Sequence, residues 1–145
     1  MSDIVVTVPM AFTYDGAPGA KGLIAWLAEG DAPGEPGSGE EWRFTIGIAP
    51  VISPGERVYV VCEGRLVGYS PLVRLEVYEI GNHRTASELI RAGGAVACTI
   101  PDKIRGFQGF RYRWWTREYE VPLDLSREIA CARRLRTKYN GNLVV

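Results

Sequence analysis

Hydrophobic and polar residues alternate, or form short apolar runs, in many separate segments along the chain. Most of these segments span four to eight residues, are rich in β-branched and aromatic residues, and are bounded by Gly or Pro, a pattern typical of β-strands. A tight turn at Glu63-Gly64 predicts a hairpin between two of them, and Thr116-Arg117 a turn between the last two. We predict strands at residues 4–8, 42–46, 57–62, 65–69, 72–78, 95–100, 110–115 and 119–121.

Helical spacing is found in three other segments. In residues 21–29, Leu23, Trp26 and Leu27 share one stripe. Residues 85–91 begin with Thr85 and Glu88, the spacing of a capping box. The last helix begins at Asp124 or Ser126 and runs to Tyr139. Its predicted apolar face comprises Ile129, Cys131, Ala132 and Leu135, and four basic residues lie in its second half, where they suit the helix dipole.

Residues 30–41 contain four glycines, two prolines and no large apolar residue, so we predict a mobile surface loop there. What precedes this loop is too short to fold alone, and the loop is therefore an insertion within a single domain spanning residues 1–145. Short antiparallel strands joined by tight turns predict an α+β fold, a small curved, mostly antiparallel β-barrel with two or three peripheral helices. An SH3-like or OB-like barrel is the alternative.

Residues 52–69, ISPGERVYVVCEGRLVGY, resemble a pattern of the PUA-like superfamily, which includes the ASCH and EVE families. Gly55-Glu56 occupies the turn before a barrel strand, and Gly68 the bend in the returning strand. The resemblance covers about residues 20–121 and implies a PUA-like barrel that binds nucleic acid, mainly RNA, or a modified nucleobase. The ASCH signature is not intact: its nearest matches are Gly19-Ala-Lys21 and Glu41-Trp-Arg43.

Composition narrows the class of protein to which the chain could belong. The 145 residues are 46% apolar and 23% charged, which is typical of a globular domain. No apolar run approaches the roughly 20 residues of a membrane span, and Asp3 lies where a signal peptide would be basic. We therefore expect a cytoplasmic protein with no membrane partner.

Metal and catalytic motifs are weak. Cys62, Cys98 and Cys131 form no CxxC pair and sit among apolar residues, so we predict buried thiols, no metal and no cofactor. His83 is expected in a solvated loop. We do not expect an enzyme, although a third hypothesis is an ASCH-like hydrolase or nuclease in which Lys21 acts with Glu41 as base.

Charge is distributed unevenly. Residues 1–100 hold seven Lys or Arg against twelve Asp or Glu, whereas residues 101–145 hold ten against five. Two interpretations stay open: the basic third forms a face for an anionic ligand, or the two parts of the chain pair with each other.

Residues 105–117, RGFQGFRYRWWTR, combine five aromatic residues with four arginines. Because alternate strand residues face opposite sides, Phe110, Tyr112 and Trp114 are predicted to pack in the core. The opposite side would present Trp115 beside two arginines, an arrangement suited to stacking a base and holding phosphate. The Gly-flanked Gln108 could contact a base edge. The predicted binding set is Arg105, Gln108, Arg111, Arg113 and Trp115, with Trp26 or Trp42 near the wall of one concave, basic surface.

Other interpretations of these residues stay open. Trp115 could be covered by the C-terminal helix, Arg111 and Arg113 could pair with nearby acids, and Trp26 could belong to the core. The second hypothesis for function is a non-catalytic structural or interaction protein. In it, the aromatic and arginine residues form an oligomer interface, because Trp, Tyr and Arg are also enriched at protein interfaces. The expected partners are therefore a nucleic acid or nucleobase-like small molecule, or a second copy of the chain.

Overall fold

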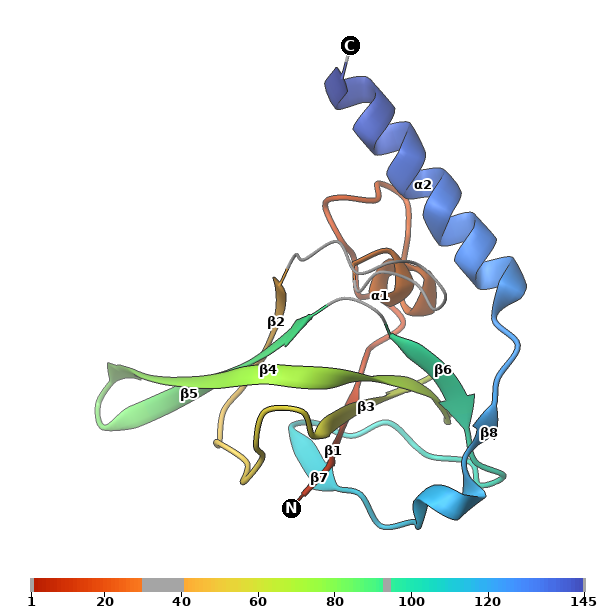
Figure 1. The fold of residues 1–145 in the computed structure, drawn as a ribbon. Coiled ribbons are helices and arrows are strands. Elements are labelled where there is room, and N and C mark those ends of the chain that lie inside the picture. Colours follow the sequence, from red (N-terminus) through yellow and green to blue (C-terminus); the bar gives the residue numbers. More distant parts are fainter. Residues whose placement is uncertain (1, 30–40, 93–94, 145) are drawn as a thin grey trace.

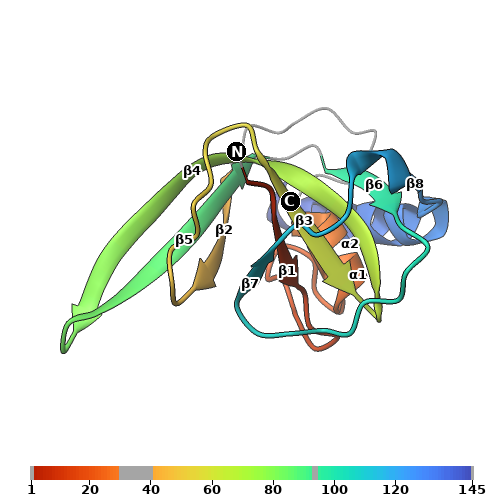
Figure 2. The ribbon, with the colours of Figure 1, turned by 90° about the horizontal axis from the view of Figure 1, so that it is seen from below.

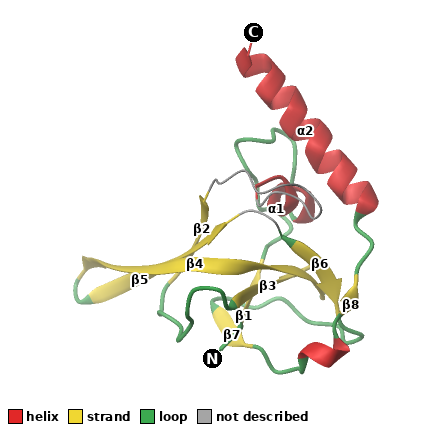
Figure 3. Cartoon of the chain, viewed as in Figure 1, coloured by secondary structure: helices red, strands yellow, loops and turns green. Residues whose placement is uncertain are grey.

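The computed structural model describes residues 2–29, 41–92 and 95–144, which fold as one sheet with the two α-helices on one side (Figures 1 and 3). Within these ranges the elements follow the chain in this order: β1 (Ile4–Thr7), α1 (Leu23–Glu29), β2 (Glu41–Ile46), β3 (Arg57–Cys62), β4 (Arg65–Gly81), β5 (Arg84–Ala92), β6 (Val96–Thr99), β7 (Phe110–Tyr112), the 3-10 helix η1 (Arg117–Tyr119), β8 (Val121–Pro122) and α2 (Ser126–Val144).

The sheet is curled and mostly antiparallel. Its strand order is β2-β5-β4-β3-β1-β7, and β6 pairs with both β4 and β8. The one parallel pair among the described strands joins β1 to β3, with Ile4 opposite Val58. Seen from below, the strands wrap into a half-barrel, and the hairpin of β4 and β5 extends away from it (Figure 2). The predicted α+β class with a curved, mostly antiparallel sheet is therefore confirmed.

The central strands β1 and β3 are buried on both faces. Ile4, Val58 and Val60 lie in one hydrophobic cluster with Trp26 and Leu27 of α1. The intervening residues face the other way, into a second cluster that is covered by the segment after β6 and contains Val5, Tyr59, Val61, Leu66, Cys98, Ile100, Ile104 and Trp115. A strand covered on both sides needs apolar residues at every position, which explains the unbroken runs in the sequence.

Gly68 allows β4 and β6 to lie close together. A Cβ atom there would lie 2.3 Å from the carbonyl oxygen of Val96 and 3.1 Å from the ring of Trp26. The register of β3 and β4 shifts beside Gly68, between Val60 and Val61. A larger side chain at this position would push β6 and α1 away from the sheet.

Residues 85–91 form strand β5, so the helix predicted there is wrong. Asn82 and His83 both have positive φ, 51° and 59°, which turns the chain back along β4. β5 then pairs with β4 on one side and β2 on the other. The backbone hydrogen bonds of β5 with these two strands outweigh the local preference for a helix at the Thr85 capping box.

Three further predictions about strands are corrected. The segments 65–69 and 72–78 are parts of one continuous strand, β4, which changes its partner from β3 to β5 after Pro71. Strand β7 ends at Tyr112 rather than at residue 115. The chain after it forms η1, and β8 pairs with β6 instead of β7, because Glu120 and Trp115 direct this segment back across the sheet.

The helix α1 and the hairpin turn at Glu63-Gly64 are found as predicted, and Cys62 and Cys98 are buried. Helix α2 is longer than predicted and packs through Ile129, Ala132 and Leu135 against α1 and the first cluster; Cys131 is half-buried. The predicted mobile loop falls almost wholly on residues 30–40, outside the described residues.

Within the described ranges, neither helix combines the length and the apolar composition that crossing a membrane requires.

Candidate aromatic binding pocket

The segment from Pro101 to Glu120 crosses the second face of the sheet and inserts Trp115 into it. The Trp115 side chain is 7% exposed. Its ring meets Tyr59 edge to face, with 5.1 Å between ring centroids. Its indole Nε1 donates a hydrogen bond to Oε2 of Glu120 at 2.9 Å. Trp115 therefore anchors the segment and is not an open platform.

Glu120 joins three side chains beneath this segment. Its Oε2 also accepts a hydrogen bond of 2.6 Å from the Tyr59 hydroxyl, and its Oε1 accepts one of 3.0 Å from Arg57. Burial, together with the Glu120 hydrogen bond, raises the pKa of Tyr59, which therefore stays a donor. These contacts fix η1 and Trp115 relative to β3.

Asp3 holds the same segment at two further positions, on either side of Trp115. One carboxylate oxygen accepts from the backbone N–H of Arg57 at 2.8 Å, and the other from Arg113 at 3.1 Å and Arg117 at 2.9 Å. Burial alone would raise the pKa of Asp3, but these donors outweigh it and lower the pKa below its ordinary value. Two basic residues of the C-terminal third thus pair with an acid at the start of the chain.

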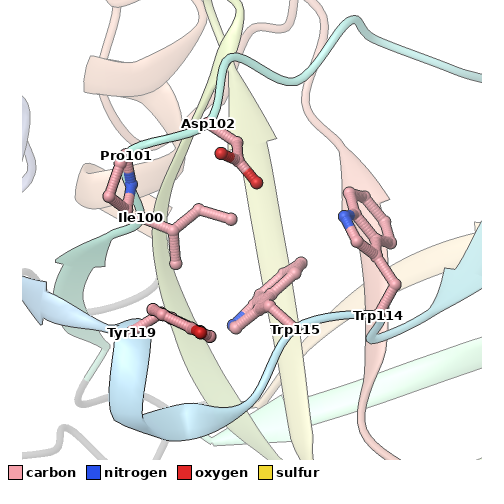
Figure 4. Close-up of a pocket in the computed structure, with 6 residues that line it drawn as sticks. All are labelled: Ile100, Pro101, Asp102, Trp114, Trp115 and Tyr119. Carbon is pink, nitrogen blue, oxygen red and sulfur yellow. The ribbon is translucent and has the colours of Figure 1, made fainter.

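A pocket of about 300 Å³ lies beside the buried ring of Trp115. Trp114 forms a second wall, perpendicular to Trp115, with 5.0 Å between the ring centroids. Trp114 is 49% exposed and Tyr119 is 63% exposed. Figure 4 shows Asp102 directing its carboxylate toward the rings from the opposite side, and Ile100 and Pro101 complete the lining. Together they form an open aromatic corner with one acidic group.

Residues 110–115 were predicted to alternate between a core face and an exposed face. For the last two residues, the structure shows the reverse of that prediction. Trp114 is exposed and Trp115 is buried, because strand alternation stops at Tyr112, where β7 ends. Tyr112, which was predicted in the core, is 45% exposed, and its hydroxyl accepts a hydrogen bond from the backbone of Val51. Phe110 packs against the first cluster, as predicted.

The residues of the predicted binding set lie in different places. Trp115 lines the aromatic pocket, whereas Arg113 lines another with Asp3 and Arg117. Gln108 is exposed in a third pocket of about 470 Å³, with Thr7 and Thr45. Arg105 is exposed, and so is Arg111, whose guanidinium lies 4.3 Å from the Phe107 ring centroid. Trp26 is a core residue, 1% exposed, and the Trp42 side chain lies outside what the structure describes.

Of the six residues that line the aromatic pocket, Trp115 alone belongs to the predicted binding set. The other five were not predicted there: Ile100, Pro101, Asp102, Trp114 and Tyr119. The tryptophan pair is visible in the sequence, but the choice of the buried ring depends on Tyr59, which lies on β3, and on Glu120, five positions after Trp115. Asp102 is twelve positions from Trp114, so only the path of the chain across the sheet brings them together.

The residues that were considered for catalysis belong to separate parts of the fold. Lys21 is exposed and forms an isolated bridge with Thr13, and the Glu41 side chain is outside the described residues. His83 is exposed in the turn between β4 and β5. Among the residues that the structure describes, no three His, Cys, Asp or Glu side chains are placed to hold a metal ion.

A buried arginine interacts electrostatically with an acid of α1. Arg91 of β5 is fully buried, and the charge of Glu29, at the end of α1, acts on it. Burial raises the pKa of Glu29 to about 7, and the positive charge of Arg91 acts in the opposite direction. This interaction was not predicted, because Arg91 was expected at the end of a helix rather than in strand β5.

No family model, no curated protein and no solved structure matches this chain.

Proposed function

We propose that the chain is a PUA-like domain that binds single-stranded nucleic acid, RNA in the first place, or a modified nucleobase. The observation that carries the proposal is the half-exposed Trp114 in the aromatic pocket. An indole with a free face stacks on any base, because every base has a π-face. The perpendicular Trp115 ring fixes the orientation of Trp114 and closes one side of the pocket.

Exposed cations on the same segment support a nucleic acid over an uncharged ligand. Lys103 and Arg105 lie one and three positions after Asp102, and Arg111 lies three positions before Trp114. Unlike Arg113 and Arg117, these three do not pair with Asp3. They are thus the side chains suited to contact phosphate.

The test is titration of a labelled, mixed-sequence single-stranded RNA of ten nucleotides at low salt, followed by fluorescence anisotropy. Trp114→Ala should lose about 1–3 kcal/mol of binding free energy, the usual contribution of one stacked base. Tyr78→Ala is the matched control, because Tyr78 is a similarly exposed aromatic residue on the distant hairpin of β4 and β5. If the wild type does not bind RNA or single-stranded DNA of the same sequence, the proposal is wrong.

The second candidate is an oligomer interface, and one observation favours it. β7 is the last strand in the order of the sheet, and Tyr112 and Trp114 are exposed on or next to it. Pairing of two such edges would extend the sheet. Light scattering coupled to gel filtration distinguishes the two functions: an interface predicts a wild-type dimer and a monomeric Trp114→Ala variant, whereas nucleobase binding predicts equal masses.

A further inference from the structure

We infer that the aromatic pocket selects guanine over the other bases through the carboxylate of Asp102. This inference rests on the proposed function and specifies its ligand. It starts from the hydrogen-bonding groups that line the pocket, since stacking alone does not distinguish one base from another.

The pocket offers one charged group, and that group can only accept hydrogen bonds. Ile100 and Pro101 contribute apolar surface, and the indole N–H of Trp115 already donates to Glu120. The other polar groups of the lining are the indole N–H of Trp114 and the hydroxyl of Tyr119, and neither is charged. Figure 4 shows the Asp102 carboxylate directed toward the rings. Within the described ranges, no residue donates a hydrogen bond to Asp102 or forms an ion pair with it, so both oxygens are open to a ligand.

Guanine is the base that complements a carboxylate best. Its Watson–Crick edge carries two adjacent donors, N1–H and the N2 amino group, which a carboxylate binds in parallel. Adenine and cytosine each offer an exocyclic amino group next to an acceptor nitrogen. Uracil offers one N–H between two carbonyl oxygens, which the carboxylate would repel.

The flanking chain fits a nucleotide rather than a free base. Lys103 and Arg105 are exposed and lie one and three positions after Asp102. A base held by Asp102 would therefore have its phosphates near two cations, which also offset the repulsion between Asp102 and the RNA backbone.

The experiment uses five RNA heptamers that differ in the central nucleotide. Each has three uridines on either side of guanosine, adenosine, cytidine, uridine or inosine, and anisotropy gives the affinities at one fixed, low salt concentration. The wild type should bind the guanosine heptamer about tenfold more tightly than the adenosine heptamer, because a bidentate pair discriminates by roughly this factor or more. Inosine lacks the N2 amino group and should lose most of that advantage.

Asp102→Asn tests the side chain itself. An amide presents one acceptor and one donor, so this variant should bind the guanosine and adenosine heptamers with similar affinity. Asp15→Asn, which removes an exposed carboxylate from the loop before α1, should keep the full preference. Circular dichroism of both variants should match the wild type.

The outcomes separate this inference from the proposed function. If all five heptamers bind equally in the wild type and in Asp102→Asn, while Trp114→Ala weakens them all, the pocket binds bases but does not select guanine. If the preference for guanosine persists in Asp102→Asn, the carboxylate is not its source and the inference is overturned. If no heptamer binds the wild type, the inference and the proposed function are both wrong.

Discussion

Replacement of Trp115 should destabilise the fold far more than replacement of its neighbour Trp114. Trp115→Ala removes a ring that is 7% exposed and packs against Tyr59, and it takes away the N–H that Glu120 accepts. Truncation of a buried Trp costs about 3–5 kcal/mol in free energy of unfolding. Trp114 is 49% exposed, and its main described contact is one edge-to-face ring pair, so Trp114→Ala should cost at most about 1 kcal/mol.

The measurement is urea unfolding followed by far-ultraviolet circular dichroism, because tryptophan fluorescence would itself change in both variants. Equal slopes of the free energy against urea concentration would show that the unfolded states are comparable. If Trp115→Ala is too unstable to purify, Trp115→Phe keeps most of the ring, loses the hydrogen bond to Glu120, and should cost about 1–2 kcal/mol.

The opposite ranking would refute this reasoning. If Trp114→Ala lost several kcal/mol while Trp115→Ala stayed within about 0.5 kcal/mol of the wild type, the strand alternation would continue through residue 115. Trp115 would then be the exposed stacking residue. The pocket described above, and the guanine preference inferred from it, would both have to be abandoned.

Three further predictions concern charge and exposure. Arg105→Ala and Arg111→Ala should each reduce the slope of log affinity for RNA against log salt by about 0.7, as expected for one lost phosphate contact. Arg84→Ala, at the distant hairpin, is the control and should leave the slope unchanged. An unchanged slope in the first two variants would exclude phosphate contacts at these arginines. Asp3→Asn should be less stable than the wild type at pH 7, and the difference in free energy of unfolding should shrink as pH falls below about 4. The pKa of Asp3 is lowered in the folded protein, so its ionised form stabilises the fold above the ordinary pKa of 3.8, and this contribution is lost on protonation. Parallel pH profiles of the free energy of unfolding for the two proteins would contradict this. Iodoacetamide at pH 8 should alkylate the half-buried Cys131 first. Burial raises the pKa of Cys62 to about 11 and that of Cys98 to about 12, so these two thiols form little of the reactive thiolate at pH 8. Peptide mass mapping that finds Cys62 or Cys98 modified earlier would show that the sheet opens there.

Much of the sheet could be predicted from local pattern. The apolar runs at Ile4 and Val58, the Glu63-Gly64 turn and the stripe of Leu23, Trp26 and Leu27 all act over a few residues, so their effect on the backbone can be inferred without knowing the partner. The same holds for the burial of Cys62 and Cys98, whose neighbours are apolar.

Contacts between different segments decided the strand conformation of residues 85–91 and the burial of the side chains in the candidate site. The Thr85 capping box favours a helix locally, but backbone pairing with β2 and β4 decided for a strand. Arg113 and Trp115 were held inward by Asp3 and Glu120, 110 and 5 positions away, while Trp114 was left outside. Sequence period determines which residues share a face, but burial depends on which other surface covers that face. The chain's path across the sheet supplied that surface. It made Trp115 the buried wall of the open pocket, placed the exposed Trp114 and Asp102 beside it, and left Arg113 in a different pocket with Asp3.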